Sequence, residues 1–290
     1  MKKGMTFSLL AAGISGISIF ANTIFVSKAD PLVFTIIRNT VVALILTMVI
    51  LANGQIKRLT TLSKKEWVKL LAIGAIGGGI PFALFFIGLA QIGAVNGNIL
   101  QKTLFLWVAL LAIPILKERI SEIQFIGYIT LFIGMFFFGG TFKIVPKLGT
   151  WLVLSATILW AIENVIAKIT LKTVPSTIVI WGRMVFGLPF LFSAVLILGK
   201  VGLLTSASSY AITPIMTSSI LLTLYVTIWY NALSKAPATL VSSVLVFAPV
   251  VTAALSLLIL GIRYFFRSIT SRFSATSARR TLRRVGSETG

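Results

Sequence analysis

Long apolar runs separated by short polar breaks extend along almost the whole chain. A helix needs about 20 residues to cross the hydrocarbon core of a bilayer, whereas a transmembrane strand needs about half as many and alternates apolar with polar residues. Backbone polar groups in lipid must pair within the spanning segment, so runs of this length indicate helices. We predict nine spans, near residues 5–26, 33–52, 68–90, 94–116, 123–140, 150–171, 177–199, 212–233 and 238–261.

The composition supports a membrane protein. Of the 290 residues, 57% are hydrophobic and only 11% are charged, whereas a soluble domain carries about 25% charged residues. The mean hydropathy of +1.03 excludes an ordinary soluble domain. The sequence therefore predicts an all-α integral membrane protein whose main partner is the lipid bilayer. The first apolar stretch, residues 5–26, is longer than the core of a signal peptide, so we expect it to be retained as a span.

The charged residues do not indicate a nucleic-acid partner. The net charge is +20, but the basic residues are scattered over the loops between apolar spans, as membrane topology signals are. The chain has no cysteine and no histidine, which removes disulfides, thiol chemistry and imidazole metal sites. We expect neither a cofactor nor a metal.

The basic residues are also divided unequally between the two sides of the membrane. The richer side holds Lys2, Lys3, Lys57, Arg58, Lys64, Lys65, Lys69, Lys117, Arg119, Lys168, Lys172, Arg183 and Lys235. The poorer side holds Lys28, Arg38, Lys143, Lys147 and Lys200. Because positive loops stay in the cytoplasm, we expect a multi-pass protein of the cell membrane whose N-terminus is cytoplasmic.

The chain repeats itself. The segment ANTIFVSK, residues 21–28, is similar to AIENVIAK, residues 161–168, and the junction Gly93-Ala94 is similar to Pro237-Ala238. A unit of five helices crosses the membrane an odd number of times, so its second copy must be inverted. Inverted repeats are typical of secondary transporters, whose substrate site lies near the midplane between the halves.

In this order the motifs resemble the drug/metabolite transporter superfamily, in the group built from two EamA-type domains. In each half, the first helix ends in a lysine and an arginine-bearing helix follows. A Gly-Ala or Pro-Ala junction then opens the fourth helix. The residues concerned are Lys28 with Arg38, Lys168 with Arg183, the two junctions, the corner Lys117-Glu118-Arg119 with the following ISEIQFIG, and Gly139-Gly140.

The resemblance implies one five-helix repeat over 5–140 and a second over 150–262. It also implies alternating access for a small metabolite, amino acid or amphiphilic compound. The chain departs from the pattern at its end. Ile262 stands where Glu118 predicts an acid, no tenth helix follows, and residues 263–290 form a basic tail that we expect to be disordered. This tail indicates either a frameshifted, truncated chain or a genuine segment that binds anionic lipid.

Two ionisable residues lie near the middle of predicted spans, Lys102 and Glu163. Such residues are costly in lipid and usually face a cavity. We expect both to face a central cavity and to pair when substrate is absent; a structural ion pair and a snorkelling lysine are the alternatives. Arg38 and Arg183 lie closer to helix ends, and for them we favour structural roles over substrate contact.

Further candidates surround this pair. Asn98 and Gln101 share one helical stripe with Lys102. Trp160, Trp229 and Tyr230 lie deep in their spans, where aromatic faces hold apolar or cationic substrates, with core packing as the alternative. In the third span, Gly77, Gly78, Gly79 and Pro81 predict a bendable segment that gates the cavity; tight helix packing is the other interpretation.

The sequence is compatible with three functions. The sequence favours a secondary transporter for a small molecule, with a proton coupled through Glu163, or another ion, as the candidate driving force. A membrane-embedded enzyme needs clustered acids, histidines or cysteines, which the sequence lacks, so we expect no enzyme activity. A truncated, non-transporting membrane protein is the third reading, and a homodimer is one oligomeric state that the sequence leaves open.

Overall fold

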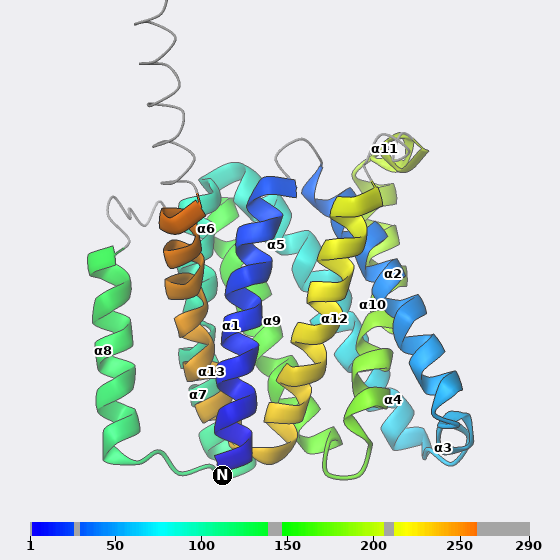
Figure 1. Ribbon diagram of the computed structural model, residues 1–290, viewed down its shortest axis with the longest axis horizontal. Coiled ribbons are helices and arrows are strands. Elements are labelled where there is room, and N and C mark those ends of the chain that lie inside the picture. The colour runs from blue at the N-terminus through cyan, green and yellow to red at the C-terminus, as the bar shows by residue number, and fades with distance from the viewer. Residues whose placement is uncertain (1, 26–29, 139–146, 206–211, 260–290) are drawn as a thin grey trace, which may run out of the picture.

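The computed structural model describes residues 2–25, 30–138, 147–205 and 212–259, and within these ranges the chain is helical, without strands. The helices form one upright bundle (Figure 1). The first half comprises α1 Lys2–Phe25, α2 Pro31–Ala52, α3 Ile56–Thr60, α4 Lys64–Ile73, the π-helix η1 Gly74–Gly79, α5 Ile80–Ile92, α6 Ala94–Lys102, α7 Leu104–Leu116 and α8 Glu122–Phe138. The second comprises α9 Leu148–Thr170, α10 Ser176–Ile197, α11 Val201–Thr205, α12 Ile212–Lys235, α13 Ala238–Val244, the 3₁₀ turn η3 Leu245–Phe247, and a final helix over 248–259.

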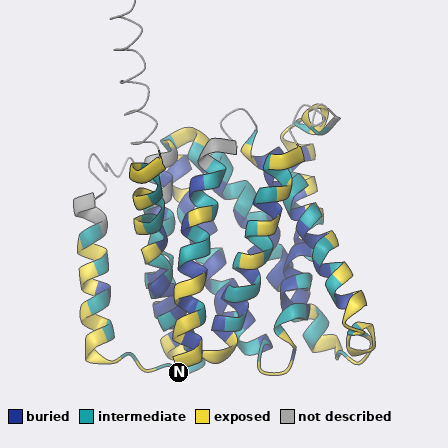
Figure 2. Cartoon of the chain, in the orientation of Figure 1, coloured by how far each residue is buried: buried dark blue, intermediate teal, exposed yellow. Residues whose placement is uncertain are grey.

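Eight of the nine predicted spans are present as long apolar helices, and the remaining one corresponds to a shorter apolar helix. Eight helical segments of the described chain are long and apolar enough to cross a bilayer, counting α4, η1 and α5 as one. The predicted span 123–140 corresponds to α8, which has 17 described residues and lies at the edge of the bundle (Figure 1). Large apolar side chains such as Met48, Leu110 and Ile123 are exposed, as expected where lipid replaces water. Figure 2 shows exposed positions along the outer helices of the bundle. The predicted tail, 263–290, lies outside the described residues.

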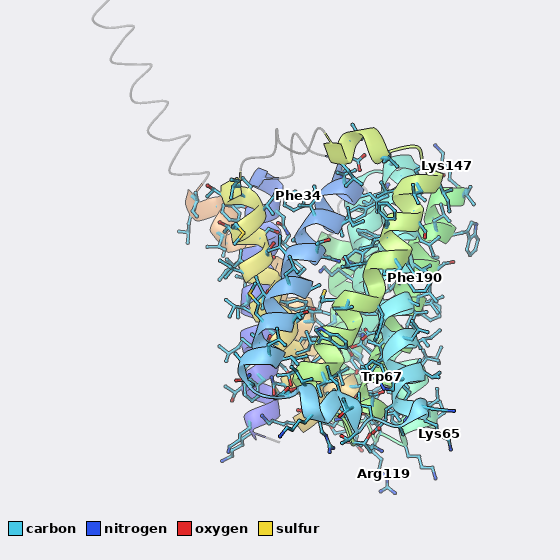
Figure 3. The ribbon with its side chains drawn as sticks, turned by 90° about the vertical axis from the view of Figure 1, so that its right-hand side faces the viewer. Phe34, Lys65, Trp67, Arg119, Lys147 and Phe190 are labelled. Atoms are coloured by element: carbon cyan, nitrogen blue, oxygen red, sulfur yellow. The ribbon has the colours of Figure 1, made fainter. Side chains whose placement is uncertain are left out.

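The two halves run in opposite directions. A β-carbon added to Gly4, at the start of α1, would contact Ala236. Lys168, near the end of α9, donates from Nζ to the carbonyl of the same Ala236 over 2.7 Å. The first helix of one repeat therefore begins at the end of the bundle where the first helix of the other repeat finishes. Basic residues mark this end too: Lys65 and Arg119 lie there, with Lys147 at the opposite end (Figure 3).

Both fourth helices are interrupted, although the sequence predicted continuous helices over 94–116 and 238–261. In the first half, Thr103 separates α6 from α7; its hydroxyl donates to the carbonyl of Leu100 and accepts from Trp107 Nε1. In the second half, η3 replaces the α-helical turn after α13. The hydrophobicity pattern does not register such breaks, because the run stays apolar across them. Discontinuous helices are how membrane proteins bring polar groups to a central cavity.

The glycine-rich segment η1 packs directly against α10. A β-carbon on Gly78 would meet the carbonyl oxygen of Arg183, and one on Gly187 would meet the backbone of Gly78. Backbones can approach this closely only where both helices lack side chains. Pro81 is buried in the first turn of α5, where its missing N–H costs no helical hydrogen bond.

Acidic residues of the first half tie the two repeats together at the ends of the bundle. Glu118 caps α13 by accepting from the backbone N–H groups of Ala238 and Thr239, at 2.7 and 3.0 Å. At the other end Asp30 caps α2 and pairs with Lys200, with 2.6 Å between Oδ2 and Nζ. Burial acts to raise the pKa of Asp30, but the hydrogen bond and charge of Lys200, together with backbone N–H groups, outweigh it and hold the pKa below its ordinary value.

Candidate functional site

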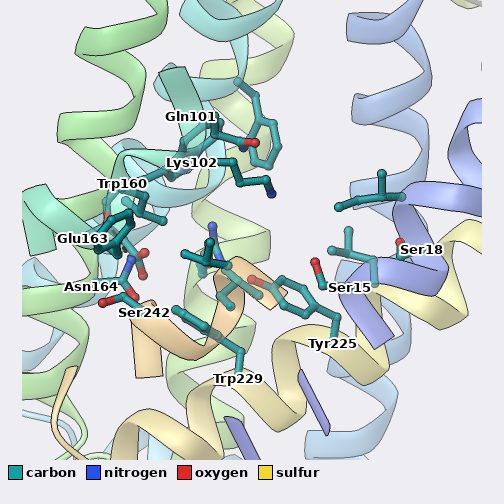
Figure 4. Close-up of a pocket in the computed structure, with 18 of the residues that line it drawn as sticks. Ser15, Ser18, Gln101, Lys102, Trp160, Glu163, Asn164, Tyr225, Trp229 and Ser242 are labelled. Atoms are coloured by element: carbon teal, nitrogen blue, oxygen red, sulfur yellow. Dashed lines mark hydrogen bonds between the residues drawn. The ribbon is translucent and has the colours of Figure 1, made fainter. Parts of the chain in front are cut away.

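A cavity of about 240 Å³ lies inside the bundle, and both repeats line it (Figure 4). The first repeat contributes α1, α2, α5, α6 and α7, and the second contributes α9, α10, α12, α13 and η3. Four ionisable side chains with long reach are among the lining residues: Arg38, Lys102, Glu163 and Arg183. Aromatic side chains form much of the remaining wall, namely Phe82, Phe105, Trp160, Tyr225 and Trp229. Such a mixture of apolar walls and a few polar groups is typical of small-molecule sites.

Glu163 is held by the second repeat and by η1. Its side chain is 1% exposed, and the Tyr230 hydroxyl donates a hydrogen bond to its Oε1. Gly77 makes room for it, because a β-carbon at this position would overlap the Glu163 side chain and approach Arg183 Nε at 3.2 Å. The predicted pair with Lys102 is not formed: these two side chains do not come within 4.0 Å as an ion pair. The Glu163 carboxylate is hydrogen-bonded to Tyr230 instead.

The carbonyl of Gly77 organises the neighbourhood of Glu163. It accepts from Arg183 Nη2 at 3.0 Å and from Trp160 Nε1 at 3.1 Å. The Arg183 guanidinium also lies 5.9 Å from the centre of the Tyr230 ring, in cation–π range. A π-helix shifts the hydrogen-bond register of its backbone, and π-bulges are frequent at functional sites. Here one carbonyl of η1 fixes an aromatic and a cationic side chain on the same wall.

Two buried polar atoms on this wall have no hydrogen-bond partner among the described residues, Asn164 Oδ1 and Arg183 Nε. Asn164 is 4% exposed and lines the cavity, and its Nδ2 donates to the carbonyl of Trp160 at 2.8 Å. Its amide is therefore fixed at one end and leaves an acceptor available to a ligand.

Two further helices that line the cavity, α2 and α6, contribute cations without acids. Lys102 ends α6 and projects into the cavity near Gln101 (Figure 4). It forms neither a hydrogen bond nor an ion pair with a described residue. Arg38, on α2, reaches only Asn39 Oδ1, at 3.4 and 3.3 Å, which is long for a hydrogen bond.

The structure brings most of the predicted site residues together. Gln101, Lys102, Trp160, Glu163 and Trp229 line the cavity. Tyr230 is fully buried behind it and acts on Glu163, while Gly77, Gly78 and Gly79 lie behind that wall. Asn98 belongs to α6, but its side chain lies outside the described residues.

The sequence prediction favoured structural roles over substrate contact for Arg38 and Arg183. Both line the cavity. Their place in the cavity could have been predicted, because ionisable side chains within a span usually face a cavity, and this applies to both arginines as it does to Lys102. Tyr225 and the serines Ser15, Ser18 and Ser242 line the cavity as well, but nothing in their local sequence sets them apart from other residues of their spans.

The fold and the cavity together define a multi-pass helical membrane protein of the inverted-repeat type. The EamA-like transporter family matches the chain twice, over residues 2–140 and 147–271, and the chain belongs to this family. A solved structure described as "Crystal structure of protein" has a TM-score of 0.71 and 16% sequence identity, covering 89% of this chain and 88% of the other. That likeness concerns the fold alone. No curated protein matches the sequence.

Proposed function

We propose that the protein is a secondary transporter that moves a small organic molecule across the cytoplasmic membrane by alternating access. The single observation that carries the proposal is the cavity lined by both inverted repeats, with ionisable and aromatic side chains on its walls. A cavity between two oppositely oriented units can be opened to either side by rocking one unit against the other, without moving the site itself. The richer basic side would face the cytoplasm, together with the N-terminus.

Gating is proposed for the segment that joins α4 to α5. The π-helix η1 supports Glu163 and Arg183 through Gly77. Next to it, Gly78 lies against the backbone of α10, and Gly79 lies against Phe190 of the same helix. A small slide of α5 against α10 would therefore change the shape of the cavity wall directly. Pro81 follows η1 in the first turn of α5, so the change from π-helix to α-helix lies beside the proposed gate.

Transport is tested with purified protein in sealed liposomes, by following uptake of labelled candidate compounds with and without a proton gradient. Saturable uptake that requires the protein, and that is lost in Lys102→Met with reconstitution unchanged, would support the proposal. Glu163→Gln tests the proton: it should remove the response to the pH gradient while leaving exchange of substrate between the two sides intact.

Orientation is tested separately, and the absence of cysteine makes this simple because no native thiol must be removed. Single variants Lys65→Cys and Lys147→Cys place a thiol at opposite ends of the bundle. In intact cells a membrane-impermeant maleimide should label Lys147→Cys and spare Lys65→Cys until the membrane is permeabilised. The reverse pattern would invert the proposed topology.

The alternative is a membrane protein that inserts and binds but does not cycle. The sequence suggests it, since residues 263–290 do not continue the repeat pattern. Binding of a compound to the cavity combined with no movement of that compound in liposomes would favour this alternative.

A further inference from the structure

The charges on the cavity wall do not balance. Three cationic side chains, Arg38, Lys102 and Arg183, face one carboxylate, that of Glu163. Glu163 already accepts a hydrogen bond from Tyr230 and lies beside Arg183 next to Gly77, and it forms an ion pair with neither Arg38 nor Lys102. Two positive charges that line the cavity, Arg38 on α2 and Lys102 on α6, are thus left without a carboxylate.

The remaining acids of the described chain are occupied or located elsewhere. Asp30 pairs with Lys200, Glu118 caps α13, and Glu66 accepts from Ser63 at the start of α4. Glu122 is exposed in the first turn of α8. Within the part of the chain that the structure describes, there is no further carboxylate with which Arg38 or Lys102 could pair.

Uncompensated cations inside a membrane protein are costly, and they are usually placed where a ligand or a water-filled cavity meets them. Arginine stays protonated at any relevant pH, so the charge of Arg38 cannot be removed by losing a proton. An anion that enters the cavity would supply the missing countercharge. Tyr225 and Trp229 line the same cavity and offer apolar, planar surfaces to the rest of such a molecule.

We infer that Arg38 and Lys102 bind the anionic group, a carboxylate or phosphate, of an organic anion whose apolar body lies against the aromatic wall. The inference rests on the proposed function, because it names the substrate class of the proposed transporter. The guanidinium presents a planar fork that suits two oxygens of one group, and the ammonium of Lys102 adds a flexible third donor. Glu163 is not a ligand in this arrangement; it balances Arg183.

The test measures binding to the purified full-length chain in a neutral detergent. The compounds of each set share an aromatic body and differ in the polar group and its charge. One set is indole-3-acetate, indole-3-acetamide and tryptamine; a second is benzoate, benzamide and benzylamine; a third is phenyl phosphate and phenol. The anionic member of at least one set should raise the melting temperature and saturate, with an affinity at least about tenfold above its neutral and cationic partners. Equal or better binding of the neutral or cationic members in every set would overturn the inference.

Variants then locate the site. Arg38→Gln and Lys102→Met should each weaken binding of the anion by about tenfold or more, and the charge-keeping variant Lys102→Arg should retain most of it. Matched controls are Arg58→Gln and Lys65→Met, which lie on the exposed surface and should change nothing. If Arg38→Gln does not fold, the contrast between Lys102→Met and Lys102→Arg still decides. Anion binding that persists in Lys102→Met and in Arg38→Gln would place it elsewhere.

A lipid phosphate is the other source of the same chemistry. Phosphatidylglycerol is therefore added alone and in competition with the best soluble anion. If the soluble anion competes with the lipid for Arg38 and Lys102, the result supports a soluble organic anion as the ligand. Stabilisation by phosphatidylglycerol and by none of the soluble anions would overturn the inference.

Liposome uptake distinguishes the inference from the proposed function. Anion binding without uptake would contradict the transporter function alone. Uptake of a neutral or cationic compound without anion binding would contradict the anionic substrate class alone.

Discussion

The charged side chains that line the cavity differ in how completely they are satisfied within the protein. Glu163 accepts from Tyr230, and Arg183 donates to the carbonyl of Gly77. Lys102 of α6 has no partner among the described residues, and the side chain of Arg38, on α2, reaches only its neighbour Asn39. Glu163 and Arg183 are therefore bonded to other helices, whereas Lys102 and Arg38 are not.

This contrast separates framework from binding surface. Removing one partner of a buried, hydrogen-bonded charge leaves the other uncompensated, so such a group specifies one arrangement of the helices around it. A charge without a partner among the protein groups costs free energy that a bound ligand can recover. Glu163 and Arg183 should therefore govern stability, and Lys102 and Arg38 should govern ligand affinity.

The largest effect on stability is expected from Glu163→Ala. It leaves Arg183 without its compensating carboxylate and Tyr230 without an acceptor, a loss of about 3 kcal/mol or more. Thermal unfolding in detergent should show a clearly lower melting temperature, while Glu122→Ala, at an exposed position of α8, should leave it unchanged. A Glu163→Ala protein with the melting temperature of the wild type would mean that Glu163 and Arg183 do not form a structural framework.

Gly77→Ala should cost somewhat less, about 1–3 kcal/mol, because the added methyl group displaces the Glu163 side chain. It should also lower the rate of transport by moving Arg183 and Trp160 from the Gly77 carbonyl. Gly13→Ala is the matched control: nothing lies within 4 Å of a β-carbon at that helical position. Identical behaviour of the two variants would remove η1 from the framework and weaken the gating proposal.

Lys102→Met should have the opposite signature. Removing an unpaired cation relieves a desolvation cost, so the melting temperature should stay the same or rise, by the equivalent of about 1 kcal/mol. Transport should nevertheless be lost, with normal membrane insertion. Uptake in liposomes and thermal unfolding of the same preparation measure both quantities. Loss of stability together with transport would show that Lys102 is part of the framework after all.

The smallest effect belongs to the ion pair outside the cavity. Because the pKa of Asp30 is lowered in the folded protein, its stabilising contribution is present above the unfolded pKa of about 3.8 and is lost as the pH falls through the lower folded value. The pair is partly exposed, so Asp30→Asn should cost no more than about 1 kcal/mol at neutral pH. The difference between wild type and variant should shrink below pH 4; a constant difference would argue against the pair.

The sequence by itself determined which segments enter the membrane, that the two halves are inverted copies, and that Lys102 and Glu163 lie between them. These features follow from local quantities, since length, hydropathy and an odd number of helices per unit are read directly from the order of residues. Partners across helices are not local. Tertiary structure alone decided that Tyr230 donates to the Glu163 carboxylate and that Arg183 donates to the Gly77 carbonyl. It also decided that Arg38 and Lys102 form no ion pair with a described residue. These contacts depend on how helices distant in the chain pack together.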